Sequence, residues 1–285
     1  MLSYRHAFHA GNHADLLKHA VFVQLLRYMV KKDKPFWCID THAGAAQYAL
    51  QGDWAQKNAE FESGIARLWD MKVLPPLLAD YVEQVRAANH NEQLRYYPGS
   101  PLIATRLLRK KDVLRLFELH STESGLLESH FRTSELRKGG RMEVTAGDGF
   151  AGLLTVLPPP SRRGLVLIDP SYEDKKDYSR VVTALREGLK RFATGTYLIW
   201  YPQVQRREAM LLPNALKREK LRDWLHVSLT VKRPEPGGRG LHGSGLFIAN
   251  PPYTLPAMLK EAMPWLVKML GQDEAAAYEL EMDVV

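Results

Sequence analysis

Two four-residue stretches combine a polar oxygen, a proline and a tyrosine in an order that suits the recognition of an aromatic amine. They are Asp169-Pro-Ser-Tyr172 and Asn250-Pro-Pro-Tyr253. The side-chain oxygen of the first residue and the proline carbonyl can accept hydrogen bonds from an exocyclic amine, and the tyrosine ring can stack on the base that carries it. Both stretches are therefore candidate reactive sites.

The two stretches differ in how well they match a known pattern. D/N/S-P-P-Y/F/W is typical of enzymes that methylate exocyclic amino nitrogens of bases; the second stretch matches it fully, whereas Ser171 departs from it in the first. The first stretch directly follows an apolar run, Leu165 to Ile168, that is typical of a buried strand in a parallel sheet. Ligands bind at the carboxyl ends of such strands. Many strands end in an acid without any catalytic reason, so this tetrad alone leaves both interpretations open.

Four predicted strands in succession end near an acidic residue. The acids are Asp40, Glu118, Asp148 and Asp169. Each is followed by a helical pattern, as in the cofactor crevice of a doubly wound α/β sheet, where an acid at the second strand binds ribose hydroxyls. The fourth strand of a class I methyltransferase sheet carries the reactive tetrad, and Leu165 begins the fourth strand here. We therefore predict Asp169, Pro170 and Tyr172 as catalytic residues, and a structural or substrate-flanking role for Asn250.

A literal match to the dinucleotide-binding pattern G-x-G-x-x-G occurs at Gly238 to Gly243. It precedes a predicted strand, residues 246–249, and not the helix whose amino terminus would receive a phosphate. We interpret it as the flexible loop of a terminal hairpin. The turn after the first strand, Asp40 to Gly44, contains a single glycine and is a weak fingerprint by itself.

The composition is that of an ordinary soluble globular protein. The 285 residues include 39 Lys and Arg against 32 Asp and Glu, and the tail from Gln272 is acidic, so the rest of the chain is more basic than the net charge of +7 suggests. This favours a polyanionic partner. Cys38 is the single cysteine, which excludes an internal disulfide and indicates a reducing compartment. No stretch is long enough to span a membrane and the start lacks an export signal, so we predict a cytoplasmic protein.

Four of the ten histidines lie in the first 19 residues, at positions 6, 9, 13 and 19. Structural zinc sites usually add cysteines, and none is nearby, so we predict no metal. Asn12 is a plausible cap for a helix from His13 to Lys31. Lys18 and His19 fall in its first two turns. They are either functional or simply surface residues of an amphipathic helix.

Residues 47–97 have a helical pattern without an apolar β-branched run, which predicts an inserted helical subdomain. Ser100 and Pro101 then suit the start of another helix, with Ser100 as its cap. Near the other end of the chain, the loop from Lys232 to His242 joins the two strands of a predicted hairpin. Lys232, Arg233 and Arg239 make this loop basic, so it is a candidate for phosphate contacts, although most basic loops are merely solvated.

Four motifs together are specific enough to suggest a family. They are Met1-Leu-Ser-Tyr-Arg-His-x-Phe-His-Ala-Gly-Asn-x-Ala-Asp15, Asp40-Thr-His-Ala-Gly44, Tyr96-Tyr-Pro-Gly-Ser-Pro-Leu102 and Arg191-Phe-Ala-Thr-Gly-Thr-Tyr197. They resemble the bacterial 23S ribosomal RNA adenine-N6 methyltransferase family, whose name places its target at adenine 2030. The resemblance is weakest in the insertion, in residues 211–239 and in the tail.

The resemblance implies a Rossmann-like, class I S-adenosylmethionine-dependent α/β fold. Its mostly parallel sheet would have seven strands with a terminal antiparallel hairpin, formed by residues 1–46 and 98–285, with the helical insertion at 47–97. S-adenosylmethionine would be the methyl donor and S-adenosylhomocysteine the product. The residues that match cofactor contacts are His19, His42, Ser100, Glu118, Asp148 and Gly149. Asp169 matches the catalytic residue and Tyr4 lies near the RNA, and we add Lys18 and the basic loop to the substrate contacts. We expect a monomer that acts on 23S rRNA.

Two alternatives remain open from the sequence. The tetrad indicates that the substrate is an amine, but it does not indicate whether RNA or DNA carries that amine. The chain could therefore be a DNA adenine-N6 methyltransferase. Ser171 and the sparse glycines also allow a non-catalytic RNA-binding protein on a degenerate methyltransferase fold. An assay on RNA against DNA separates the first alternative, and failure to bind S-adenosylmethionine would favour the second.

Overall fold

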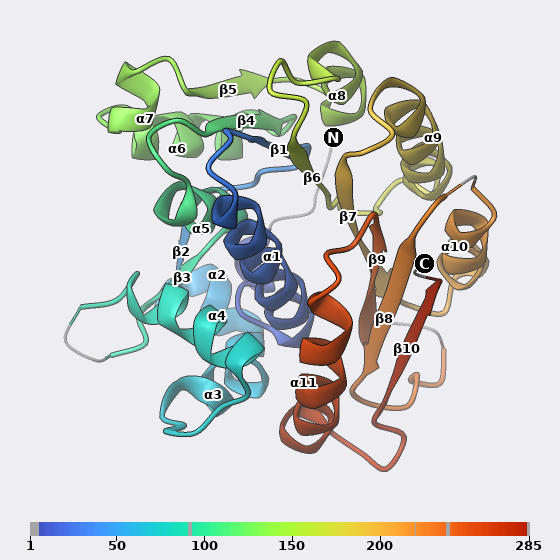
Figure 1. Ribbon diagram of the computed structural model, residues 1–285. Coiled ribbons are helices and arrows are strands. Elements are labelled where there is room, and N and C mark those ends of the chain that lie inside the picture. Colours follow the sequence, from blue (N-terminus) through green and yellow to red (C-terminus); the bar gives the residue numbers. More distant parts are fainter. Residues whose placement is uncertain (1–5, 91–92, 220, 238–239, 284–285) are drawn as a thin grey trace.

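The computed structural model describes residues 6–90, 93–219, 221–237 and 240–283. Within these residues the centre is an eight-stranded sheet of order β10-β8-β9-β7-β6-β1-β4-β5 (Figure 1). Its strands are β1 (Trp37–Asp40), β4 (Val113–Glu118), β5 (Met142–Ala146), β6 (Gly164–Ile168), β7 (Thr196–Gln203), β8 (Trp224–Thr230), β9 (Gly243–Ala249) and β10 (Ala277–Asp283). Strands β5, β4, β1, β6 and β7 are parallel, whereas β9, β8 and β10 pair antiparallel. The strand order reverses between β4 and β6 on either side of β1, which is where such sheets form a crevice.

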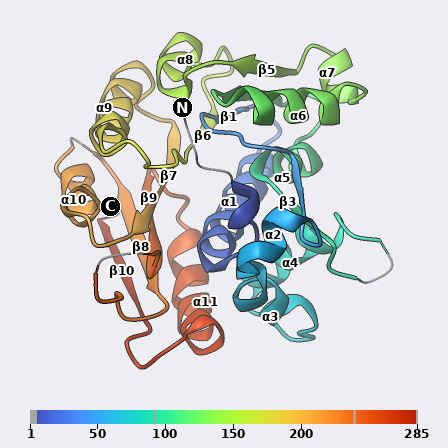
Figure 2. The same cartoon turned by 180° about the vertical axis from the view of Figure 1, so that it is seen from behind.

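Helices cover both faces of the sheet, as the two opposite views show (Figure 1 and Figure 2). The helices α8, α9 and α10 pack on one face, where they share an apolar core with Ile39, Val166 and Ile199. The opposite face carries α1, α5 and α11, which share a second core with Cys38, Leu167 and Leu198. These helices are α1 (His13–Lys31), α5 (Ser100–Leu107), α8 (Gly149–Val156), α9 (Lys176–Arg191), α10 (Arg207–Lys217) and α11 (Leu255–Leu270). Alternate residues of a strand face opposite ways, which explains why neighbours such as Cys38 and Ile39 join different cores.

The helix α1 has the bounds that the sequence predicts, and it is more deeply buried than an amphipathic pattern would suggest. All its residues from His13 to Leu26 are buried. The Asn12 side chain caps it by accepting hydrogen bonds from the amides of Ala14 and Asp15, both at 2.9 Å. The alternative that Lys18 and His19 are surface residues is therefore wrong: their exposed fractions are 4% and 1%.

The acidic tail contains a strand that the sequence analysis missed, so the sheet has eight strands and not seven. Strand β10 pairs antiparallel with β8 from Ala277 to Asp283. Its Leu280 and Met282 pack against the core, while Glu279 and Glu281 face the other way. This alternation is the ordinary pattern of an edge strand, but the net charge of the segment obscured it. The terminal hairpin of β8 and β9 is as predicted, and β9 follows the G-x-G-x-x-G match, of which residues 238–239 lie outside the described residues.

Residues 47–97 are mostly helical, as the sequence predicts, and they also contain a short ribbon. The elements are β2 (Gln47–Ala49), α2 (Asp53–Asn58), η2 (Glu60–Ser63), α3 (Ala66–Trp69), α4 (Pro76–Arg86) and β3 (Tyr96–Pro98). Strands β2 and β3 pair with each other, apart from the main sheet. Helix α4 packs on α1 and α11, and Leu78 and Val82 belong to the same apolar core as α1. The insertion is thus joined to the rest of the protein by a shared core.

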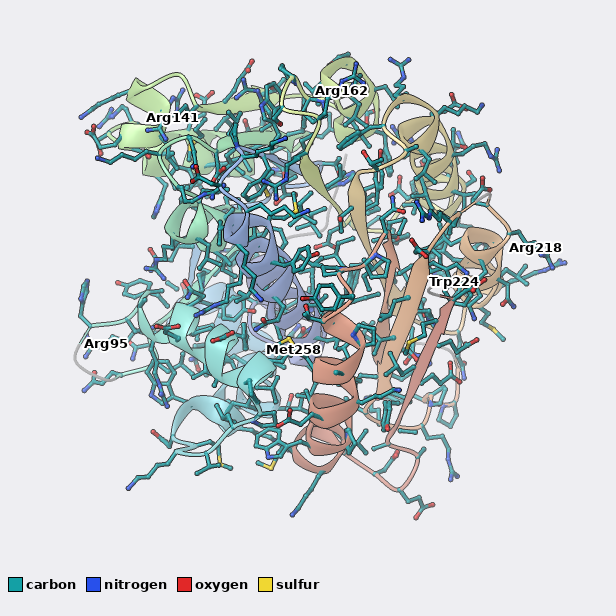
Figure 3. The ribbon with its side chains drawn as sticks, viewed as in Figure 1. Arg95, Arg141, Arg162, Arg218, Trp224 and Met258 are labelled. Atoms are coloured by element: carbon teal, nitrogen blue, oxygen red, sulfur yellow. The ribbon has the colours of Figure 1, made fainter. Side chains whose placement is uncertain are left out.

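Two further helices lie between β4 and β5: α6 (Ser121–Phe131) and α7 (Glu135–Lys138). A short 3-10 helix, η1 (His6–Phe8), precedes α1. Arginine side chains lie all around the periphery of the molecule, and Figure 3 labels Arg95, Arg141, Arg162 and Arg218 among them. No helix in the described part of the chain has the length and the apolar composition that a membrane span requires.

Candidate functional site

A cleft of about 270 Å³ opens at the carboxyl ends of the parallel strands. All six residues that the sequence predicts as cofactor contacts line it: His19, His42, Ser100, Glu118, Asp148 and Gly149. Lys18, Asp169 and Pro170 line the same cleft. Residues from His6 to Arg180 are thereby brought together, and the acids at the ends of β1, β4, β5 and β6 meet because these parallel strands all end at this edge of the sheet (Figure 1).

The end of β1 places a buried carboxyl group beside the cleft. Asp40 is 1% exposed and accepts hydrogen bonds from the Ser100 hydroxyl at 2.7 Å and from the His42 amide at 3.2 Å. Burial raises the pKa of Asp40 to about 7, although both hydrogen bonds act in the other direction. Ser100 is thus a partner of Asp40 and not the predicted helix cap: α5 begins at Ser100 itself, with Gly99 in the capping position.

The neighbouring turn holds His42 and Gly44 against β4. The His42 ring packs edge-on against Phe150 with a centroid distance of 4.8 Å, and burial lowers the pKa of this histidine to about 3. Glu118, at the end of β4, accepts hydrogen bonds from the Gly44 amide at 2.8 Å and from the His120 amide at 2.7 Å. Burial raises the pKa of Glu118, and these two amides oppose the shift. The carboxyl group therefore fixes the turn as well as lining the cleft.

The start of α8 makes the closest backbone approach in the site. A Cβ on Gly149 would lie 1.7 Å from the carbonyl oxygen of Thr41, so only glycine fits here. Asp148 caps the helix by accepting from the Phe150 amide at 3.0 Å, and it also pairs with the guanidinium group of Arg180. The same guanidinium lies over the Phe150 ring, 4.3 Å from its centroid.

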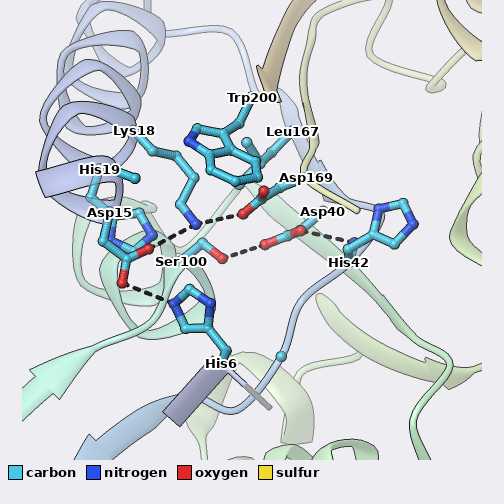
Figure 4. A network of polar contacts seen from close by, with 12 residues as sticks. His6, Asp15, Lys18, His19, Asp40, His42, Ser100, Leu167, Asp169 and Trp200 are labelled. Atoms are coloured by element: carbon cyan, nitrogen blue, oxygen red, sulfur yellow. Dashed lines mark hydrogen bonds and ion pairs between the residues drawn. The ribbon is translucent and has the colours of Figure 1, made fainter. Parts of the chain in front are cut away.

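A buried ion-pair network reaches from α1 to the end of β6 (Figure 4). The Lys18 ammonium lies 2.9 Å from Asp15 Oδ1 and 2.5 Å from Asp169 Oδ2. His6 Nε2 lies 2.8 Å from Asp15 Oδ2. Burial opposes the charge of Lys18, but the two carboxylates more than offset it and raise the pKa of Lys18 above its usual value. Lys18 therefore stays charged and holds one oxygen of Asp169.

On the same helix, His19 is enclosed by the insertion. Its Nδ1 and the Tyr97 hydroxyl share a hydrogen bond of 2.7 Å, and Tyr97 in turn lies 3.0 Å from the Tyr81 hydroxyl. Burial is the main cause that lowers the pKa of His19, and the charge of Lys18 adds to it. His19 is therefore a neutral polar group at the wall of the cleft.

Comparisons with known proteins point to one family. The family model described as "Ribosomal RNA large subunit methyltransferase D, RlmJ" matches residues 33–282. A relative from Escherichia coli (strain K12), named ribosomal RNA large subunit methyltransferase J, is 47% identical over 93% of this chain and 93% of its own length. A relative of the same name from Haemophilus influenzae is 44% identical over 99% of this chain and 98% of its own. The chain belongs to this family.

A solved structure agrees with this assignment. A crystal structure of a Legionella pneumophila protein matches with a TM-score of 0.86 and 35% identity, over 96% of this chain and 98% of that one. The class I methyltransferase fold and the rRNA methyltransferase family predicted from the sequence motifs are confirmed. The comparisons lend no support to a DNA methyltransferase or to a degenerate, non-catalytic relative.

Within this rRNA methyltransferase family member, the tetrad after β6 presents its first two residues to the cleft but not its tyrosine. Tyr172 is 2% exposed, and its hydroxyl donates a hydrogen bond to the Trp200 carbonyl at 2.6 Å. Its ring packs 4.6 Å from that of Tyr178. The expectation that the Tyr172 ring stacks on a base does not fit this arrangement, because both ring faces are covered. The ring instead anchors the turn that carries Asp169.

The second tetrad lies at the opposite edge of the sheet, because β9 runs antiparallel to β7. Asn250 donates from its amide nitrogen to the carbonyl oxygens of Ala193 and Gly195, at 2.9 and 2.7 Å. It has a positive φ of 53°. Of the two roles that the sequence leaves to Asn250, the structure thus shows the structural one.

In the basic loop after β8, neither Lys232 nor Arg233 is among the residues that line the cleft. Lys232 pairs with Glu235, and Arg233 pairs with Glu274 at 3.2 Å while its amide donates to Asp273. The loop nevertheless begins at the reactive edge of the sheet, because Thr230 at the end of β8 and Gln203 at the end of β7 both lie opposite Gly243. Tyr4 and Arg239, also predicted to contact substrate, lie outside the described residues.

Several residues of the cleft were missed or left without a role. Asp15 and His6 join the Lys18 network, but their sequence spacing gives no sign of Asp169 as a partner. Arg180 comes from the second turn of α9, and no sequence pattern marks it. His120 and Glu123 line the cleft, and buried atoms of both, Nδ1 and Oε2, have no hydrogen-bond partner among the described residues.

Proposed function

We propose that this protein transfers a methyl group from S-adenosylmethionine to the exocyclic N6 amine of an adenine in 23S rRNA, adenine 2030 by the family resemblance, leaving S-adenosylhomocysteine. The observation that carries the proposal is the placement of Asp169 and Pro170 at the wall of a cleft whose other walls bear Glu118 and Asp148. Asp169 and Pro170 can accept hydrogen bonds from the amine, and Glu118 and Asp148 beside them can accept hydrogen bonds from the nucleoside of the cofactor. The chain also belongs to an rRNA methyltransferase family.

The chemistry needed at the amine is positioning and polarisation. The lone pair of an adenine amine is delocalised into the ring, so the amine is a poor nucleophile. If the Asp169 carboxyl and the Pro170 carbonyl accept its two N–H groups, the lone pair is localised away from the ring. As N6 gains the methyl group that the bound cofactor would supply, the Asp169 carboxyl would accept the surplus N6 proton. Lys18 is a positioning residue, because it holds one oxygen of Asp169 and leaves the other for the amine.

The residues of the cleft fit the proposed cofactor. When bound, S-adenosylmethionine supplies an electrophilic methyl group on a positive sulfonium centre. Glu118 offers carboxyl oxygens for ribose hydroxyls, and the unpartnered His120 Nδ1 and Glu123 Oε2 are polar atoms that a ligand could satisfy. The close approach of Gly149 to Thr41 keeps side chains out of this wall. His42, His19, Ser100 and Asp148 complete the proposed cofactor contacts.

The proposed partner is RNA, and the residues proposed to contact it do not all lie in one cleft, unlike those proposed for the cofactor. Tyr4 and the loop with Lys232, Arg233 and Arg239 remain our candidates for substrate contacts. Because Lys232 and Arg233 are already paired with acids, each phosphate contact would replace an existing ion pair. Lys18, in contrast, is buried and bonded on two sides, so we assign it to Asp169 and not directly to the RNA.

The test uses 23S rRNA isolated from cells that lack the protein, with a DNA of the same target sequence as comparison. We expect methylation of a single adenine in the RNA, mapped by mass spectrometry of nuclease fragments, and none in the DNA. Methylation of DNA alone, or of a different atom, would contradict the proposed substrate.

Cofactor binding is tested separately by calorimetry with S-adenosylmethionine. Glu118→Gln should weaken binding by about tenfold, because an amide accepts hydrogen bonds less well than a carboxylate at the ribose. Glu128→Gln, on the exposed face of α6, is the matched control and should leave the affinity unchanged. A folded Glu118→Gln protein with wild-type affinity would remove Glu118 from the cofactor site.

A further inference from the structure

A second pocket lies on the other side of β7 from the reactive cleft, between α10 and the antiparallel strands. Its volume is about 320 Å³, and the residues that matter here are Tyr201, Lys217, His226, Glu279 and Glu281. The pocket shares no lining residue with the first cleft. Its lining residues come from β7, α10, β8 and β10 and from the segments that adjoin them.

His226 is the most deeply buried polar side chain of this pocket. Its side chain is 3% exposed, and its Nε2 lies 2.6 Å from the Tyr201 hydroxyl. The tyrosine reaches it across β9 because that strand has Gly245 at the crossing, where a Cβ would lie 2.2 Å from the Tyr201 ring. The other ring nitrogen, Nδ1, has no hydrogen-bond partner among the described residues. A buried ring nitrogen without a hydrogen bond is a candidate to bind a water molecule or an ion.

Strand pairing brings two carboxylates to that nitrogen. Glu281 of β10 lies opposite His226 of β8, and Glu279 lies opposite Ser228, two positions along the same face. The distance from His226 Nδ1 to Glu281 Oε1 is 3.6 Å. One atom from each of the three residues falls within 4.8 Å of the others, and in the described part of the chain no other group of histidine, cysteine and acidic residues does so.

The protonation states suit a metal ligand. Burial lowers the pKa of His226 to about 4, and the charge of Lys217 lowers it further while Glu281 opposes the shift. The imidazole is therefore neutral at neutral pH, the form in which histidine binds metals. The Tyr201 hydroxyl, hydrogen-bonded to Nε2, would act as the second partner that orients a ligating histidine.

Lys217 is the competing cation in this pocket. Its ammonium lies 2.8 Å from Glu281 Oε1 and 5.4 Å from the centroid of the Trp224 ring. It neutralises one of the two carboxylates but makes no hydrogen bond with His226 Nδ1. Metal binding must therefore displace this ammonium, and a variant without it should bind more tightly.

We propose that His226 Nδ1, Glu279 and Glu281 form a binding site for a divalent transition-metal ion, with Zn²⁺ as the best match. One nitrogen and two carboxylate oxygens are ligands that zinc accepts, with water in the remaining position. The prediction of no metal rests on the histidines near the start of the chain. There, His6 pairs with Asp15 and His9 with Glu60, so those side chains are directed to separate carboxylates.

The experiment titrates Zn²⁺ into chelator-treated, full-length protein and follows binding by calorimetry and by thermal unfolding. We expect one site whose affinity falls at least tenfold in His226→Gln and in Glu279→Gln. Lys217→Met should bind at least threefold more tightly than the wild type. Two control variants, His9→Gln and Glu274→Gln, should bind as the wild type does.

Glu279 is exposed, so its variant tests the proposal even if His226→Gln fails to fold. Absence of a stoichiometric Zn²⁺ site in the wild type would overturn the proposal. So would a site that persists in Glu279→Gln but disappears in His9→Gln, because the ion would then bind near the start of the chain.

Discussion

The two tetrads of this protein share a pattern of letters and differ in almost everything else. Asp169-Pro-Ser-Tyr172 ends a parallel strand, its carboxyl group is at the wall of the cleft and its tyrosine is buried. Asn250-Pro-Pro-Tyr253 ends an antiparallel strand at the opposite edge; its amide is bonded to backbone and its tyrosine is 77% exposed. The tetrad that matches the pattern better is the one that does not line the cleft.

The comparison teaches that strand direction decides which tetrad can react. A strand that runs with β1 and β6 ends at the cleft in which we propose that cofactor and substrate meet, whereas β9 runs against β7 and ends on the far side. The two turns even share a positive φ, at Tyr172 and at Asn250. This residue is the fourth of the first tetrad and the first of the second, so a positive φ by itself does not mark the reactive turn.

The largest effect should follow removal of the first acid. Asp169→Ala should lower kcat for methylation by about a thousandfold, because the amine loses a positioned acceptor, while S-adenosylmethionine affinity stays nearly intact. Single-turnover methylation and calorimetry on the same preparation check this. If Asn250→Ala abolishes turnover in a folded protein and Asp169→Ala does not, our choice between the tetrads is wrong.

The second effect concerns buried charge at the reactive edge. Burial raises the pKa of Asp40 to about 7, so between about pH 4 and pH 7 the folded protein holds a proton that the unfolded chain has lost. The wild type should therefore lose stability as pH rises through this window, by a few kcal/mol at about 1.4 kcal/mol per unit, and no further above it. Asp40→Asn, which is neutral throughout, should lack this loss.

Urea unfolding from pH 4.5 to pH 8 gives the free energy of unfolding of the wild type and of Asp40→Asn. The contributions of the other titrating groups cancel in the difference between the two. Asp70→Asn, at an exposed helix end, is the control and should follow the wild type. Parallel curves for the wild type and Asp40→Asn would show that Asp40 titrates normally.

The third effect is on stability and not on turnover. Asn250→Ala removes two hydrogen bonds to backbone carbonyls and places alanine at a positive φ, which together should cost about 2 kcal/mol. We expect a lower midpoint of urea unfolding and a kcat within about twofold of the wild type below that midpoint. Unchanged stability would mean that the amide contacts contribute nothing.

The smallest effect should come from restoring the pattern. Ser171→Pro should keep kcat within about threefold, since the chemistry uses the Asp169 side chain and the Pro170 carbonyl. Among the described residues, the Ser171 hydroxyl accepts only a weak hydrogen bond, from the Glu173 amide at 3.5 Å. A hundredfold loss in steady-state assays would show that this turn needs serine.

The sequence was informative where local pattern and chain order agree. The bounds of α1, the order of the strands and the acids at four strand ends follow from apolar periodicity and from the connectivity of parallel sheets. The same order predicted that Asp40, Glu118, Asp148 and Asp169 would lie at one edge, which the structure shows.

The sequence was uninformative where a side chain meets a distant partner. Nothing near Lys18 indicates that it bonds to Asp169, 151 residues later, and nothing near Arg180 indicates Asp148. A motif specifies residue types and not χ angles, so it could not show that the Tyr172 ring turns away from the cleft. Its ring turns inward because Tyr178 and the Trp200 carbonyl offer it a buried partner.

The outermost strand, β10, affects how readily two copies of the protein could pair through the edges of their sheets. An unprotected strand edge is a template for pairing with another chain, and carboxylates along that edge discourage it. Strand β10 covers β8, whose side chains from Leu225 to Leu229 are buried, and it carries three acids, Glu279, Glu281 and Asp283, of which Glu281 pairs with Lys217 of α10. The negative charges of Glu279 and Asp283 therefore make edge-to-edge pairing of two sheets at β10 less favourable.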